Sequence, residues 1–215
     1  ISEQIEIESE VAELVLELGG TVSLLAHGVS TTKAFRQGDE LPQTRFVIRN
    51  INLYQSGDLN NEHLQTIGDC HYLKNLILAS THVSDRRIEH LSKLSSLQSL
   101  DLSYTRSDGT CLKALANLPS LHSLHLAGSS IVPENEAAVA EMRSLRQLRM
   151  SGVAIDDQIL DLLKNCRNLN LLQMKGSMVT GEGLASLMTL PSLQELGLRE
   201  VALTDRDIET LGHFP

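Results

Sequence analysis

Residues 73–96 read LKNLILASTHVSDRRIEHLSKLSS, and a stretch with the same spacing of apolar residues follows directly. The leucine that opens this stretch returns every 24 residues without a gap, at Leu73, Leu97, Leu121, Leu145, Leu169 and Leu193. A fixed period of this length is the sequence signature of a solenoid, in which each unit packs only against its neighbours. The sequence therefore predicts one elongated repeat domain.

The two halves of each unit have different periods. Counting the first leucine as offset 0, apolar residues at offsets 3 and 5 are two apart, as in a strand with one buried face; Leu76 and Leu78 are an example. Offsets 15 and 18, occupied by Ile88 and Leu91, are three apart, as on one face of a short helix. Asp85 precedes them where a helix N-cap belongs, as do Asp157 and Asp205 in later units. Each unit is predicted to be a strand, a turn and a short helix.

Seven units account for residues 48–215, with boundaries at 48–72, 73–96, 97–120, 121–144, 145–168, 169–192 and 193–215. The first unit matches the others after a one-residue insertion near Gly57. The unit at 121–144 is irregular because Pro133 follows Ile131 and Glu136 occupies offset 15, which predicts a local distortion or shifted helix, or else a bend or contact on the helix side.

Residues 1–47 do not repeat. Apolar residues from Ile7 to Leu18 recur at helical spacing, and Val22 and Leu24 alternate with polar residues as in a short strand. We interpret 1–47 as a helix and strand that cap the exposed apolar face of the first coil. The alternative is an acidic helix that binds a partner, since the other faces carry six glutamates.

Composition disfavours several kinds of function. A net charge of −9 disfavours nucleic acid binding, and no apolar run approaches the ~18 residues that span a membrane. Cys70 and Cys166 lie in one column of the repeat, four units and roughly 20 Å apart, too far for a disulfide. We therefore expect the three cysteines, including Cys111, to be small buried apolar residues, which favours a reducing, cytoplasmic location.

The repeat pattern, with turns such as Thr81-His82-Val83-Ser84-Asp85, resembles a leucine-rich repeat. The variety it most resembles is known from bacterial proteins, including those of planctomycetes, and it is also similar to the cysteine-containing repeats of F-box substrate adaptors. The resemblance implies an α/β fold: a right-handed, horseshoe-shaped solenoid with a parallel concave sheet and short convex helices. Many leucine-rich repeats carry Asn at offset 8, but Thr81, Thr105 and other residues replace it here, so a continuous asparagine ladder is absent.

In this arrangement the side chains at offsets 2, 4 and 6 face outward from the concave sheet. Offset 4 places Asp101, His125 and Arg149 side by side in successive units. Arg149, Lys175 and Arg199 form a basic cluster on an otherwise acidic chain.

The Asp101–His125 pair invites a catalytic interpretation, but we expect no serine or cysteine within hydrogen-bond reach of His125. His122 and His125 are three apart on a strand and cannot easily share a metal ion. The sequence has neither a glycine-rich phosphate loop nor paired-cysteine zinc spacing. We therefore predict no enzyme activity, no catalytic or metal-binding residues and no cofactor.

The sequence predicts a non-catalytic recognition module that binds a protein or peptide, with an acidic partner favoured, on its concave face. The expected contact residues are Tyr54, Asp101, Tyr104, His125, Arg149, Lys175 and Arg199. One alternative is a regulatory or sensor domain of a larger multidomain protein, such as a repeat-linked kinase; another is a substrate adaptor for an attached enzyme. Because no cap is evident after Phe214, the last repeat is also expected to allow a homodimer.

Overall fold

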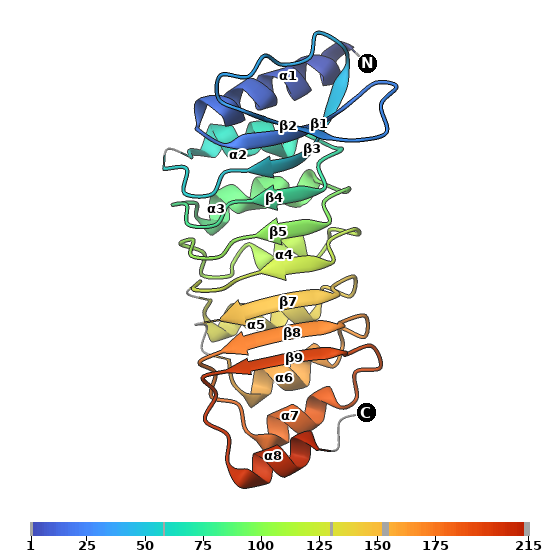
Figure 1. Ribbon diagram of the computed structural model, residues 1–215. Coiled ribbons are helices and arrows are strands. Elements are labelled where there is room, and N and C mark those ends of the chain that lie inside the picture. Colours follow the sequence, from blue (N-terminus) through green and yellow to red (C-terminus); the bar gives the residue numbers. More distant parts are fainter. Residues whose placement is uncertain (1, 58, 130, 152–154, 213–215) are drawn as a thin grey trace.

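The computed structural model describes residues 2–57, 59–129, 131–151 and 155–212. Within these ranges nine strands form one sheet in the order β2-β1-β3-β4-β5-β6-β7-β8-β9 (Figure 1). Short helices lie behind the sheet and cover one of its faces, leaving the other open. Three residues named above are affected by these limits. Phe214 lies outside the described residues, and the side chains of Pro133 and Glu136 are not described.

The strands repeat once per coil of the solenoid. From β3 onward, neighbouring strands are parallel, and the register places Ile77, Asp101, His125, Arg149, Gln173 and Gly197 side by side, as the repeat predicts. The strands are β1 (Thr21–Ala26), β2 (Lys33–Arg36), β3 (Phe46–Asn52), β4 (Asn75–Ile77), β5 (Ser99–Asp101), β6 (Ser123–His125), β7 (Gln147–Ser151), β8 (Leu171–Lys175) and β9 (Glu195–Arg199).

Each coil returns through a helix of one or two turns. The helices are α1 (Ser2–Glu17), α2 (Asn61–Gly68), α3 (Asp85–Ile88), the 3-10 helix η1 (Glu89–Lys93), α4 (Leu112–Leu115), α5 (Pro133–Ala140), α6 (Asp157–Leu163), α7 (Gly181–Leu187) and α8 (Asp205–Leu211). In the irregular unit, α5 begins at the same offset as α3, so its helix is not shifted. Val139 fills the core at offset 18 with none of its surface exposed.

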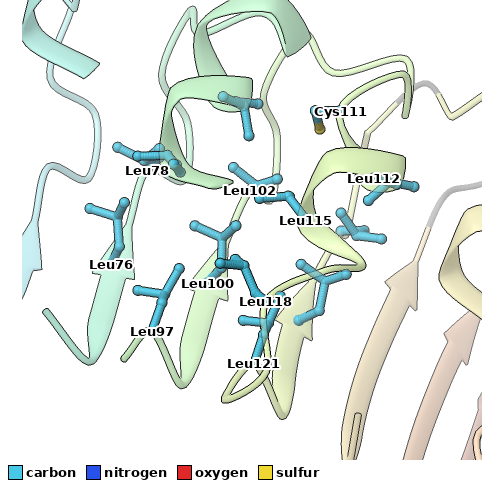
Figure 2. Close-up of a cluster of buried hydrophobic side chains, with 14 of the residues drawn as sticks. Leu76, Leu78, Leu97, Leu100, Leu102, Cys111, Leu112, Leu115, Leu118 and Leu121 are labelled. Atoms are coloured by element: carbon cyan, nitrogen blue, oxygen red, sulfur yellow. The ribbon is translucent and has the colours of Figure 1, made fainter. Parts of the chain in front are cut away.

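The core is a set of aliphatic columns that run along the solenoid. Leu76, Leu100 and their equivalents at offset 3, as far as Leu172, are almost completely buried, and each lies beside the same residue of the next coil (Figure 2). Cys70, Cys111 and Cys166 are buried and unpaired. Burial raises the pKa of the Cys166 thiol to about 11, so it packs as a small apolar group.

Helix α1 and the antiparallel pair β1–β2 close the first coil. Val11 and Val15 of α1 are fully buried, while Glu6, Glu10 and Glu13 are exposed. Glu8 is an exception on this acidic helix: it is 1% exposed, and its Oε2 accepts the backbone N–H of Ile48 at 2.6 Å. Strand β2 is absent from the sequence prediction, because its residues alternate weakly and only Phe35 is buried.

The prediction that Asp85, Asp157 and Asp205 cap their own helices is wrong. Each is the first helical residue, and α6 is instead capped by Asp156. The Asp85 carboxylate reaches across to the next coil, where it accepts hydrogen bonds from Ser107 Oγ, Asp108 N and Cys111 N at 2.8, 2.8 and 3.0 Å. In the same way, the Asp157 carboxylate accepts hydrogen bonds from the backbone N–H and the hydroxyl group of Thr180 in the next coil. These carboxylates therefore tie neighbouring coils together at the start of the helical segment.

No helix in the described ranges is both long and apolar enough to cross a membrane.

We expect Asp85→Asn to lower the free energy of unfolding by about 2 kcal/mol, because an amide cannot accept all three donors. Burial raises the pKa of the Asp85 carboxyl, but the hydrogen bonds from Cys111, Asp108 and Ser107 outweigh it and hold this pKa below its usual value. A lowered folded-state pKa stabilises the fold above the unfolded-state pKa of ~3.9, and this stabilisation is lost as pH falls through the folded-state pKa.

Urea unfolding at several pH values measures this effect. The wild type should lose its advantage over Asp85→Asn as the pH drops below about 4. The exposed Asp161, which forms an ion pair with Lys164, provides the control: Asp161→Asn should change stability by less than about 0.5 kcal/mol. Equal effects of the two substitutions would contradict a coil-to-coil role for Asp85.

Candidate functional site

The open face of the sheet is hollowed along its first six coils. This sheet hollow has a volume of about 580 Å³. Its lining side chains come from strands β3 to β8 and the turns that follow them: Asn52, Tyr54, Ile77, Ala79, Ser80, Asp101, Ser103, Tyr104, His125, Ala127, Arg149 and Gln173. The small side chains of Ala79, Ser103 and Ala127 leave the middle of the face unfilled and so create the hollow.

Five of the seven predicted contact residues line the sheet hollow: Tyr54, Asp101, Tyr104, His125 and Arg149. Lys175 and Arg199 do not line it. They are register neighbours on the adjacent strands β8 and β9, and they continue the same face toward the last coil. Lys175 also forms an exposed ion pair with Glu200 at 3.2 Å, a contact that solvent screens and a partner could replace at little cost.

His125 is held from both sides of its ring. Its Nδ1 lies 3.6 Å from Asp101 Oδ2, and its Nε2 lies 3.4 Å from Ser123 Oγ. Burial raises the pKa of the Asp101 carboxyl, but contacts with His125 and the N–H of Ser103 outweigh it and lower this pKa, so Asp101 is a carboxylate at neutral pH. The expectation that no serine lies within reach of His125 is wrong, because residues two apart on a strand face the same side.

This Ser–His–Asp arrangement suits positioning better than nucleophilic catalysis. Both distances exceed those of the direct hydrogen bonds that activate a nucleophile. Ser123 is 7% exposed and is not among the residues that line the hollow. Asp101 and Ser123 therefore flank the His125 ring, which lines the hollow.

Arg149 carries an unsatisfied donor. Its Nε is buried and has no hydrogen-bond partner among the described residues. Leaving a charged donor without an acceptor costs free energy. Because Nε itself is buried, a bound molecule supplies an acceptor to it only if the Arg149 side chain changes its rotamer.

Tyr104 is a rigid aromatic surface at the edge of the hollow. It is 66% exposed, and its backbone has a φ of +55°, in the left-handed region. The same positive φ recurs at offset 7 of the other described coils, at Gln55, Ser80, Gly128, Gly176 and Glu200. The Tyr104 ring lies against Gly128, where a Cβ would fall 2.5 Å from ring atom Cε1.

The sequence analysis missed the role of Gly128. The signal was present, because glycine occupies offset 7 in three consecutive units, at Gly128, Gly152 and Gly176. Gly152 lies outside the described residues. Glycine adopts a positive φ without strain, and at Gly128 it also leaves room for the neighbouring ring.

A second hollow, of about 410 Å³, lies at the cap between α1, the end of β1 and the start of β3. Its lining includes Glu8, Phe46 and Tyr72, and none of the predicted contact residues. Because Glu8 binds the backbone of β3, we attribute this hollow to the packing of α1 on the first coil. No group of three or more His, Cys, Asp or Glu side chains in the described part of the chain could hold a metal ion.

The structure is similar to those of known solenoids. An internalin (inlF) from Listeria monocytogenes matches with a TM-score of 0.56 and 22% sequence identity, over 75% of this chain and 50% of that chain. The PEPR1–AtPEP1 complex matches with a TM-score of 0.53 and 19% identity, over 77% of this chain and 24% of that chain. This chain has the leucine-rich-repeat fold.

At these identities the likeness establishes the leucine-rich-repeat fold alone, and the chain spans half or less of the length of these two structures. No protein-family model and no curated protein matches the chain. The predicted fold class, with a parallel sheet and short helices, is confirmed.

We expect Gly128→Ala to destabilise the leucine-rich-repeat domain by more than Gly176→Ala does. Both glycines have nearly the same φ, +66° and +67°, but a Cβ at Gly176 meets nothing within 4 Å. The strain of a left-handed alanine, about 1 kcal/mol, is therefore common to both, and the difference measures displacement of the Tyr104 ring.

Thermal unfolding of the two variants, alone and combined with Tyr104→Ala, tests this contact. Tyr104→Ala should remove the excess cost of Gly128→Ala and leave that of Gly176→Ala unchanged. Equal costs for the two glycine variants would show that the ring does not depend on Gly128.

Proposed function

We propose that this leucine-rich-repeat domain is a non-catalytic recognition module that binds a segment of another protein, or a peptide, in the sheet hollow. The observation that carries the proposal is a hollow lined by Arg149 and by two exposed tyrosines, Tyr54 and Tyr104. Tyrosine and arginine side chains are enriched in the hot spots of protein interfaces. The similarity to internalin and to the PEPR1–AtPEP1 complex supports a protein-interaction role in general terms.

The partner is acidic where it meets the later coils. Arg149, Lys175 and Arg199 give this part of the face a local positive charge on a chain of net charge −9. Opposite charges across an interface speed encounter and exclude wrong partners. The three buried, unpaired cysteines support a reducing, cytoplasmic location for the interaction.

Replacing Arg149, Lys175 and Arg199 together by Glu should weaken binding of acidic peptides by at least roughly tenfold, because favourable charge pairs become repulsive. Peptides selected on the wild-type domain from a random library should be enriched in Asp and Glu. Their affinities for the wild type and the variant, measured by fluorescence anisotropy, provide the readout.

A matched control reverses three exposed basic residues on the helical side, Arg86, Lys113 and Lys164. This control has the same net charge as the variant and should bind with nearly wild-type affinity. If both variants lose affinity equally, net charge and not the sheet face controls binding. Unchanged affinity in the sheet-face variant would overturn the site.

Self-association through the last coil stays a prediction. Leu196, Leu198 and Leu203 are only partly buried there, and Ile208 is 57% exposed. If this coil pairs with a second copy, light scattering at rising concentration should approach twice the chain mass of 23.6 kDa. Leu196→Glu should then restore the monomer, whereas a constant 23.6 kDa in the wild type would exclude the dimer.

A further inference from the structure

The sheet hollow is polarised in charge along the solenoid. Asp101 lies in the unit at 97–120 and Arg149 two units later, with His125 between them in the same row of paired residues. Asp101 is the one acidic side chain that lines the hollow, and Arg149 is the one side chain there with a permanent positive charge. Asp101 and Arg149 do not pair with each other. Asp101 contacts His125, and the Nε of Arg149 has no hydrogen-bond partner among the described residues.

The spacing of these two charges follows from the sheet. Adjacent strands lie about 4.8 Å apart, so Asp101 and Arg149 are separated by about 10 Å across β5, β6 and β7. A peptide in the polyproline II conformation advances about 3.1 Å per residue and completes one turn in three residues, so its side chains i and i+3 lie on the same side, about 9 Å apart. A segment that crosses the strands in this conformation would place residues i and i+3 over the two charges.

The part of the hollow on the Asp101 side is built to hold a long side chain. Tyr54 and Tyr104 border it, and the floor between them is made of the small residues Ala79 and Ser103. Both tyrosines are more than half exposed, and the ring of Tyr104 rests against Gly128. A guanidinium group can stack on such a ring and reach a carboxylate at the same time.

We propose that the segment bound in the sheet hollow carries an arginine and, three residues away, an acidic residue. The arginine stacks on Tyr104 and pairs with Asp101, and the acidic side chain accepts a hydrogen bond from Arg149. The His125 ring, flanked by Asp101 and Ser123, separates the two subsites. This inference rests on the proposed function and adds to it the chemistry and spacing of the partner.

The test uses four capped peptides. Ac-Gly-Arg-Ser-Ser-Glu-Gly-NH2 carries both charges at the proposed spacing, and two relatives replace its Arg or its Glu by Gln. The fourth, Ac-Gly-Ser-Arg-Glu-Ser-Gly-NH2, places the charges side by side. The chain contains three tyrosines and no tryptophan, so tyrosine fluorescence and aromatic NMR shifts report directly on the site.

We expect the first peptide to bind at least fivefold more tightly than each of the other three. Asp101→Asn should abolish the advantage of Arg over Gln and keep that of Glu, whereas Arg149→Gln should do the reverse. Tyr104→Ala should weaken the Arg-containing peptides, and Tyr72→Ala, which changes an exposed tyrosine outside the hollow, should not. Cooperative unfolding of each variant confirms that it is folded.

The outcomes separate this inference from the proposed function. If the Arg and Gln peptides bind equally, but the acidic peptide still depends on Arg149, the arginine subsite is wrong and the acidic-partner proposal stands. If the side-by-side peptide binds as well as the first, the spacing is wrong. If none of the four binds, the inference is overturned, and acidic peptides selected from the library then decide the proposed function independently.

Discussion

The structure depends on the stacking of identical apolar positions between neighbouring coils. A single unit cannot bury its leucines, because its strand and helix are too short to cover each other, so each coil is stable only against the next. Leu76, Leu100 and Leu124 show the consequence: each is at most 1% exposed and lies beside its equivalent in the adjacent strand. A slip of one residue between coils would turn this whole column toward solvent.

The same constraint fixes the surface. Once the inward residues are in register, the outward residues of successive coils must also align, and the chain gains rows of side chains at strand spacing. Asp101, His125 and Arg149 are neighbours for this reason, although 24 residues separate each from the next. Cross-coil bonds from Asp85 and Asp157 reinforce the alignment on the helical side.

The candidate site combines this alignment with local strain. In the described coils the turn after the strand places one residue in the left-handed region, where a tyrosine is more strained than a glycine. Tyr104 tolerates it with its ring against Gly128, which leaves the aromatic face exposed beside the hollow. The contact with Gly128 supports the Tyr104 ring before anything binds, and such preorganisation reduces the entropy that binding must overcome.

The sequence by itself determined the repeat, the strand register and the aligned rows, because a 24-residue period with fixed apolar offsets permits one way of stacking. It also placed Tyr54, Asp101, His125 and Arg149 on one face, since alternate residues of a strand face opposite sides. Tyr104, at offset 7, lines the same hollow from the left-handed turn that follows its strand. Only the tertiary structure decided how side chains from different coils meet. The support of Tyr104 by Gly128 and the reach of Asp85 into the next coil depend on rotamers and turn geometry that no spacing rule specifies.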